Sequence, residues 1–187
     1  MPYKNISFAE QRVAVFVDVQ NMYYSCKNLY NANLNFGEVL HTAVGTRKLI
    51  RAFAYVIRAE VGKEQDFFDA LETQGYEVKV KDLQIFYGGA KKGDWDVGLT
   101  IDAVILANKV DVVVLVTGDG DYAPLVKFLQ NNKGCKVEVI SFKKTTSSIL
   151  INEVDLYTDM TENLKKYLVK TNFSKWKYSK NDKISAK

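Results

Sequence analysis

Four aspartates stand where strands are predicted to end or a helix to begin, and they are the residues best suited to chemistry. Asp18 closes the apolar run VAVFVD, Asp96 lies in KKGDWD, and Asp119 and Asp121 lie in TGDGD after VVVLV. A carboxylate directly after a buried run is unfavourable unless a neighbour compensates its charge. Carboxylates on adjacent strands repel each other, and a divalent cation removes that repulsion. We therefore expect an acidic site for Mg²⁺ or Mn²⁺, which prefer oxygen ligands.

Histidine- and cysteine-based mechanisms are disfavoured by composition. His41 is the only histidine, and Cys26 and Cys135 stand alone without CxxC spacing. A zinc site made of cysteine and histidine needs about four such ligands. A Ser-His-Asp or Cys-His mechanism also needs a suitably placed histidine. If the chain is an enzyme, its carboxylates have to carry the chemistry, which a divalent ion allows without histidine.

The elements that would position these acids follow an alternating pattern. Short β-branched and aliphatic runs predict buried parallel strands at 12–18, 50–57, 112–117 and 136–141, with a weaker one at 77–81. Helical patterns lie between them at about 21–31, 36–46, 64–74, 95–109, 121–133 and 145–152. Strands that alternate with helices predict an α/β protein with both faces of its sheet covered. In such sheets, ligands bind at the carboxyl ends of the strands.

Each acidic residue also has an ordinary structural interpretation. Asp119 could cap the following helix, and Asp121 is the better candidate for that cap. Asp96 could be a first-turn acid that the helix dipole favours, and Asn21 could be a helix cap. Asp102 lies six residues beyond Asp96, roughly 120° around a helix, so we expect it to support the site or face solvent.

Length and charge predict one core domain with a basic appendage. The 187 residues suit a single domain, expected over 1–170, followed by a tail at 171–187. Residues 165–187 contain eight lysines and one acid, whereas the rest of the chain is mildly acidic. The tail could follow a phosphate backbone or simply aid solubility. No apolar run reaches the roughly 18 residues of a membrane span, and the N-terminus shows no signal-peptide pattern, so we expect a cytoplasmic protein without a membrane partner.

Three segments, in order, carry a resemblance to a known family. They are FVDVQNMYY, KKGDWDVGLTIDAVILA and VVVLVTGDGDYAPLVKFLQ, and SSILINEVDLYTDM adds a weaker match. Over about residues 12–160 the chain resembles the NYN domains, in the LabA-like branch of the PIN-like nuclease superfamily. The resemblance implies a Rossmann-like three-layer sandwich with a mostly parallel sheet of five or six strands. Its implied strand order is 3-2-1-4-5, with the strands at 12–18 and 112–117 adjacent at the centre.

The same resemblance implies Mg²⁺- or Mn²⁺-dependent endoribonuclease activity, with RNA or a related nucleic acid as the partner. By motif position, Asp18, Asp96 and Asp119 would be the metal ligands and catalytic acids. Asp121 would be a fourth catalytic acid that supports the water shell of the metal. The resemblance leaves the basic tail without an assigned role.

Three further residues are implied to bind substrate. Asn21 would orient the cluster or a bound phosphate, and the Thr117 hydroxyl would hold Asp119 or a phosphate. Lys92 would neutralise the scissile phosphate, although a solvated loop charge is an equally good interpretation. The first motif departs from the family pattern, because Val19 stands where a small residue is usual. This departure bears on catalytic competence more than on the fold.

Alternative functions remain open at this point. A non-catalytic RNA-binding regulatory module would keep the pocket without turnover. A phosphatase of the haloacid dehalogenase type needs an acid two residues after the strand-end aspartate, where this chain has Gln20. A dinucleotide-binding dehydrogenase is disfavoured because no G-x-G-x-x-G follows the first strand and Asp18 would repel pyrophosphate.

A homodimer is a further expectation. Tyr23, Tyr24 and Tyr30 could form an exposed aromatic surface that supports one. Packing of the same tyrosines within the helix layer is the alternative interpretation.

Overall fold

The computed structural model describes residues 7–58, 64–85, 87 and 91–169. The predicted basic tail at 171–187 lies outside these residues. No helix in the described part is both long and apolar enough to cross a bilayer.

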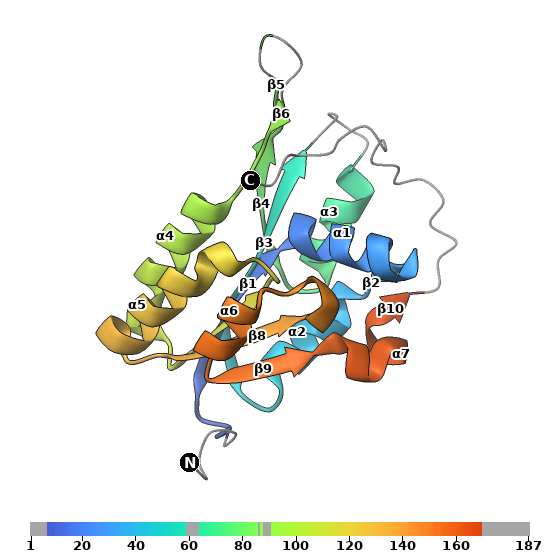
Figure 1. The fold of residues 1–187 in the computed structure, drawn as a ribbon. Helices are drawn as coiled ribbons and strands as arrows, with labels where there is room; N and C mark the ends of the chain where they lie inside the picture. Colours follow the sequence, from blue (N-terminus) through green and yellow to red (C-terminus); the bar gives the residue numbers. More distant parts are fainter. Residues whose placement is uncertain (1–6, 59–63, 86, 88–90, 170–187) are drawn as a thin grey trace.

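The centre of the fold is a six-stranded sheet in the order β4-β3-β1-β7-β8-β9, in which every neighbouring pair is parallel (Figure 1). The strands, in sheet order, are β4 Glu77–Asp82, β3 Lys48–Arg58, β1 Arg12–Asp18, β7 Val112–Val116, β8 Lys136–Ser141 and β9 Leu156–Asp159. The first five strands confirm the expected order, and β9 is a sixth strand at the edge of the sheet. As predicted, β1 and β7 are adjacent at the centre.

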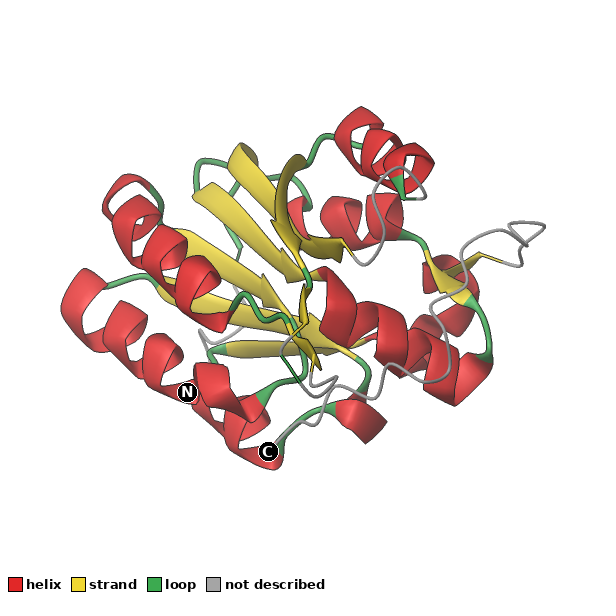
Figure 2. Cartoon of the chain, turned by 90° about the horizontal axis from the view of Figure 1, so that it is seen from above, coloured by secondary structure: helices red, strands yellow, loops and turns green. Residues whose placement is uncertain are grey.

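Helices cover both faces of this sheet, which confirms the α/β three-layer architecture (Figure 2). One face carries α1 Val19–Tyr30, α2 Phe36–Val44, α3 Gln65–Thr73 and α7 Leu164–Tyr167. The other carries α4 Asp96–Leu106, α5 Ala123–Lys133 and α6 Ser148–Glu153. Two short antiparallel pairs lie outside the main sheet: β2 Asn33–Leu34 with β10 Leu168–Val169, and β5 Gln84–Ile85 with β6 Lys91–Lys92.

Alternation along β1 explains how one strand serves two cores. Val13, Val15 and Val17 face the layer of α1, α2 and α3, whereas Ala14 and Phe16 face α4, α5 and α6. All five side chains are fully buried. A central parallel strand is covered on both faces, so it reads as a continuous apolar run instead of an alternating one.

One buried ion pair interrupts the apolar pattern of β8. Arg47 donates to both carboxylate oxygens of Glu138, at 2.8 and 2.9 Å. Lys136 lies 2.9 Å from the same carboxylate. The three cation–carboxylate contacts lower the pKa of Glu138 against the opposing effect of burial, so this carboxylate is held in its charged form.

The tyrosines of α1 contribute to packing. Tyr23 is buried, and the ring of Tyr30 lies 5.3 Å from that of Phe142. Tyr24 is half-buried and packs edge-on against Tyr23 at 5.6 Å. The expectation that these residues form an exposed aromatic surface is therefore wrong, because the helix turns them toward its neighbours.

Candidate metal centre

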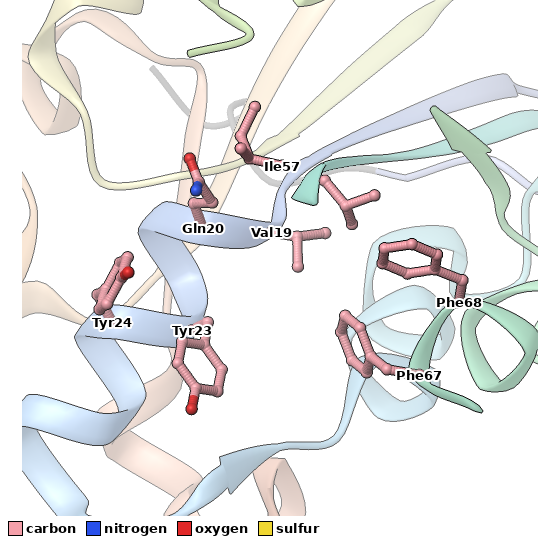
Figure 3. Close-up of a pocket in the computed structure, with 8 residues that line it drawn as sticks. Val19, Gln20, Tyr23, Tyr24, Ile57, Phe67 and Phe68 are labelled. Carbon is pink, nitrogen blue, oxygen red and sulfur yellow. The ribbon is translucent and has the colours of Figure 1, made fainter. Parts of the chain in front are cut away.

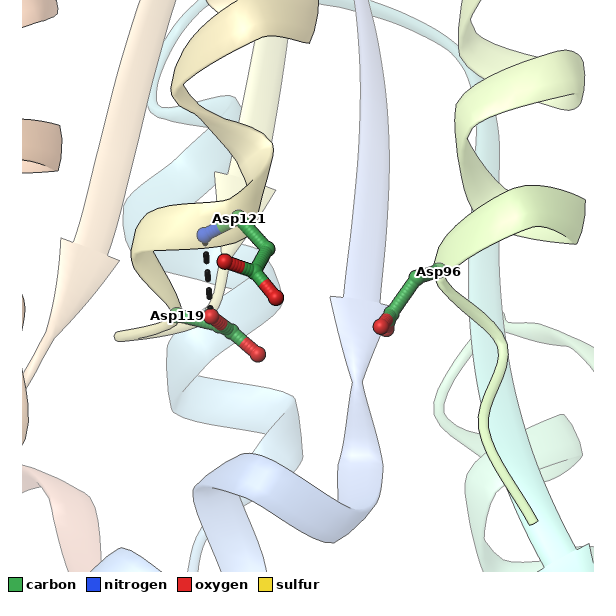
Figure 4. A group of neighbouring side chains, drawn as sticks. All are labelled: Asp96, Asp119 and Asp121. Atoms are coloured by element: carbon green, nitrogen blue, oxygen red, sulfur yellow. Dashed lines mark hydrogen bonds between the residues drawn. The ribbon is translucent and has the colours of Figure 1, made fainter. Parts of the chain in front are cut away.

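Three carboxylates converge at the carboxyl edge of the sheet (Figure 4). Asp96, Asp119 and Asp121 each offer one oxygen, and these oxygens all lie within 4.8 Å of one another. Asp96 is the first residue of α4, whereas Asp119 and Asp121 lie between β7 and α5. Segments far apart in the sequence therefore form one acidic group, which we call the acid cluster.

The loop after β7 is held in place by hydrogen bonds around Asp119. One Asp119 oxygen accepts from the N–H of Asp121 at 2.9 Å and caps the short 3₁₀ turn Gly120–Tyr122. The N–H of Asp119 donates to Thr117 Oγ1 at 3.2 Å. The N–H of Gly118 donates to Asn21 Oδ1 at 2.9 Å, which ties the loop to α1. Asp119 is therefore oriented from both sides, and its second oxygen is available to the cluster.

Gly118 allows this loop to pack against the segment that follows β8. An added Cβ at this position would lie 2.6 Å from the carbonyl oxygen of Thr145. The carbonyl of Gly118 accepts from the N–H of Ser147 at 2.9 Å. A side chain here would push the two segments apart and displace Asp119.

Asp96 is positioned by a buried tyrosine. The hydroxyl of Tyr122, a residue only 1% exposed, donates to Asp96 Oδ1 at 3.0 Å. Burial is the main cause of a raised pKa at Asp96, the Tyr122 hydrogen bond opposes it, and the charges of Asp119 and Asp121 add to it. The fold therefore makes the ionised form of Asp96 unfavourable in the absence of a compensating positive charge.

Trp95 fixes the start of α4, and thus the backbone of Asp96. Its indole N–H donates to the carbonyl of Val56 on β3 at 2.9 Å. The ring lies across the first helical turn so closely that a Cβ on Gly98 would approach it to 2.6 Å. The W-x-x-G spacing in this chain thus has a packing reason.

Asp18 lies beside the acid cluster without being one of its three members. It caps α1 by accepting from the N–H of Asn21 at 3.1 Å, and Thr117 hydrogen-bonds to its carboxylate. Burial raises the pKa of Asp18 to about 7, and the charges of Asp96 and Asp119 add to this effect. The charges of the acid cluster thus act on the Asp18 carboxylate. Its role as a metal ligand remains a prediction.

The predicted substrate-binding residues have mainly structural contacts. The Asn21 amide and the Thr117 hydroxyl hold the loop that carries Asp119. Lys92 belongs to β6, and its side chain lies outside the described part. Two of the cap interpretations were wrong: Asp18, not Asn21, caps α1, and Asp119, not Asp121, caps the turn after β7.

The side chain of Asp102 contacts the sheet and does not simply face solvent. Its carboxylate accepts from the hydroxyl of Tyr55 at 2.8 Å and pairs with Lys79 at 2.5 Å. These contacts cross from α4 to β3 and β4, so Asp102 stabilises the packing of the helix that carries Asp96.

A pocket begins directly after Asp18 in the chain (Figure 3). Val19, Gln20, Tyr23, Tyr24, Val56, Ile57, Phe67 and Phe68 line it. The Nε2 atom of Gln20 is buried there and has no hydrogen-bond partner among the residues that the structure describes. The lining has no charged side chain, and the space it encloses is only about that of one water molecule, so this pocket is not a metal site.

The fold and the acid cluster define the class of protein: a Rossmann-like α/β domain with carboxylates gathered at the carboxyl edge of its sheet. The model of the NYN domain family matches residues 12–162, and the chain belongs to that family. This confirms the resemblance found in the three sequence segments.

Two similar proteins extend the comparison. The Low amplitude and bright protein LabA of Synechococcus elongatus is 25% identical over 181 residues, which cover 89% of this chain and 92% of LabA. A crystal structure of VPA0982, a protein of unknown function from Vibrio parahaemolyticus, is 35% identical with a TM-score of 0.79. That match covers 88% of this chain and 99% of VPA0982.

Proposed function

We propose that this protein is a Mg²⁺- or Mn²⁺-dependent endoribonuclease that hydrolyses phosphodiester bonds at the acid cluster. The observation that carries the proposal is the convergence of Asp96, Asp119 and Asp121 to within 4.8 Å. Membership of the NYN family, which is related to the PIN-like nucleases, supports it.

The donor set fits a hard divalent cation. All three members of the cluster are carboxylates, and carboxylate oxygens favour Mg²⁺ or Mn²⁺ over softer metals. Asp96, Asp119 and Asp121 would hold the ion, and Asp18 would add negative charge beside it. When bound, such an ion polarises a phosphodiester and promotes deprotonation of the attacking water.

The remaining residues would keep the carboxylates in place. The Tyr122 hydroxyl restricts the rotation of the Asp96 carboxylate, and Thr117 and Asn21 fix the loop of Asp119. Preorganised ligands of this kind need little rearrangement when the reaction begins. Lys92 is proposed to contact the scissile phosphate, from its position shortly before α4.

Aromatic rings of α1 and α3 support a nucleic-acid substrate. Tyr24 and Phe67 are partly exposed, and stacking on such rings stabilises bound nucleobases.

The test is cleavage of a labelled single-stranded RNA by the purified full-length chain, with Mg²⁺, with Mn²⁺ or with excess chelator. We expect cleavage only with metal, and its loss in Asp119→Asn, because the amide keeps the cap but removes a charged ligand. Glu72→Gln, an exposed acid on α3, is the matched control and should cleave normally. Cleavage that persists in chelator would contradict the metal assignment.

Binding without cleavage is the outcome that supports the alternative function. If the wild-type chain binds the RNA tightly but cleaves it with neither metal, a regulatory RNA-binding module explains the site better. A DNA strand of the same sequence, measured in parallel, tests whether the substrate is RNA.

A further inference from the structure

Helix α4 carries apolar side chains on its outer face as well as on its inner one. Leu99, Ala103 and Leu106 are buried against the sheet. On the outside, Val97, Ile101 and Ile105 are 69%, 53% and 62% exposed. Their spacing of four residues places them in one row, which we call the α4 stripe. Single exposed apolar residues are common, but a continuous row marks an interaction site.

We propose that the α4 stripe is the interface of a homodimer, in which α4 packs antiparallel against α4 of a second copy. The stripe is symmetric about Ile101, with Val97 four residues before it and Ile105 four residues after it. A two-fold axis at Ile101 places Val97 of each copy opposite Ile105 of the other. A two-fold interface requires this kind of self-complementary surface.

Charges at the two ends of the stripe agree with antiparallel packing. Asp94 precedes the helix, and the exposed Lys109 ends the 3₁₀ turn Ala107–Lys109 that continues it. Lys133 adds positive charge at the same end, since its Nζ donates to Asn108 Oδ1 at 3.0 Å. Antiparallel helices bring the acidic end of one copy to the basic end of the other, whereas parallel helices would bring like charges together. This complementarity of the surface with itself favours a second copy over an unrelated partner.

A neighbouring helix extends the apolar surface. In Figure 1, α4 and α5 lie beside each other at one edge of the molecule. Phe128 of α5 is 38% exposed, and the Nζ of Lys133 lies 5.9 Å from its ring centre. Lys133 in turn contacts Asn108, so Phe128 lies near the carboxyl end of the α4 stripe. Two helices thus contribute to the interface.

The proposed pairing would hold the acid clusters of the two copies at a fixed distance from each other. Asp96 begins α4, so antiparallel pairing puts the two copies of Asp96 at opposite ends of the paired helices. The helix has 11 residues and a length of about 16 Å. The proposed dimer would stabilise the helix that carries one carboxylate of each cluster.

Analytical ultracentrifugation of the full-length chain over a concentration series tests the proposal. We expect a monomer–dimer equilibrium for the wild type. Ile101→Glu places two like charges at the two-fold axis and should raise the dissociation constant at least about a hundredfold. Ile149→Glu is the matched control, because Ile149 is 64% exposed on α6, outside the stripe. Circular dichroism checks that both variants fold.

A charge exchange tests the antiparallel arrangement itself. Asp94→Lys or Lys109→Asp alone should weaken the dimer, and the two together in one chain should restore it. A wild-type chain that stays monomeric throughout the series overturns the proposal. So does a dimer that Ile101→Glu and Ile149→Glu affect equally, or one that the double exchange fails to restore.

Discussion

Replacing Asp18 by Asn should stabilise the metal-free protein at alkaline pH. Burial, together with the charges of Asp96 and Asp119, raises the pKa of Asp18 from 3.8 to about 7 in the folded chain. Between these pH values the folded chain holds a proton that the unfolded chain releases. The stability associated with Asp18 is therefore fully present below pH 3.8 and is lost as the pH rises through about 7.

The size of the effect follows from the shift in pKa. With a pKa raised by about three units, at about 1.4 kcal/mol each, the folded wild type is less stable than at low pH by about 4 kcal/mol at pH 8, where Asp18 is ionised in both states. At pH 5 the loss is about 2 kcal/mol, because the folded chain keeps a proton that the unfolded chain releases. Partial solvent access of the carboxylate reduces both values, so we expect a gain of about 2–4 kcal/mol at pH 8. Asparagine has nearly the same shape and is an equally good helix cap, so the bond from the Asn21 N–H is kept.

Urea unfolding in excess chelator, followed by circular dichroism at pH 5 and pH 8, measures this gain. Asp18→Asn should unfold at higher urea than the wild type, with the larger difference at pH 8, while it loses metal-dependent cleavage. Glu72→Gln serves again as the control and should show neither effect. An Asp18→Asn midpoint equal to that of the wild type at pH 8, or a gain that is the same at both pH values, would refute the reasoning.

Three further predictions follow from the contacts described above. Tyr122→Phe removes a hydrogen bond that lowers the pKa of Asp96. The loss of Mn²⁺ affinity on acidification, measured by calorimetry, should therefore begin at a higher pH than in the wild type. An unchanged pH dependence of Mn²⁺ affinity would contradict the role of the hydroxyl. Gly118→Ala should reduce the free energy of unfolding by about 1–3 kcal/mol, seen as a lower Tm, because the methyl group meets backbone. Arg47→Met should destabilise the fold by about 3–5 kcal/mol in urea unfolding, because it leaves the buried Glu138 charge poorly paired. Adding Glu138→Leu should recover most of that loss, and a double variant as unstable as the single one would count against an ionic cause.

The fold could be predicted because its signals are local. The apolar run of β1 and the alternation of strands with helices are properties of short segments, and they determine a parallel sheet with two covered faces. The strand order came from the family resemblance, since pairing partners cannot be read from the strands themselves. The sixth strand, Leu156–Asp159, was expected only through its weaker family match.

The site could be predicted at the level of residues but not of contacts. The strand-end and helix-start positions of Asp96 and Asp119 indicated that they would meet. Whether Asp18 or Asp121 lies closer to the other two depends on side-chain rotation, which spacing does not determine. Tyr122 was missed, although its position directly after TGDGD was a signal that it could reach the cluster.

Contacts between elements far apart in the sequence could not be predicted either. Asp102 was expected to support the site or face solvent, because its spacing from Asp96 separates their faces on α4. Its partners Tyr55 and Lys79 come from β3 and β4, and only the assembled sheet places them under the helix.

The placement of β7 between β1 and β8 has a consequence for synthesis on the ribosome. The strand that delivers Asp119 leaves the ribosome after β1, β3 and β4, and it can be buried only by joining the exposed side of β1. A nascent or truncated chain that ends before β7 lacks two of the three clustered carboxylates. Such fragments cannot assemble the acid cluster, which therefore forms only in chains in which β7 has paired with β1.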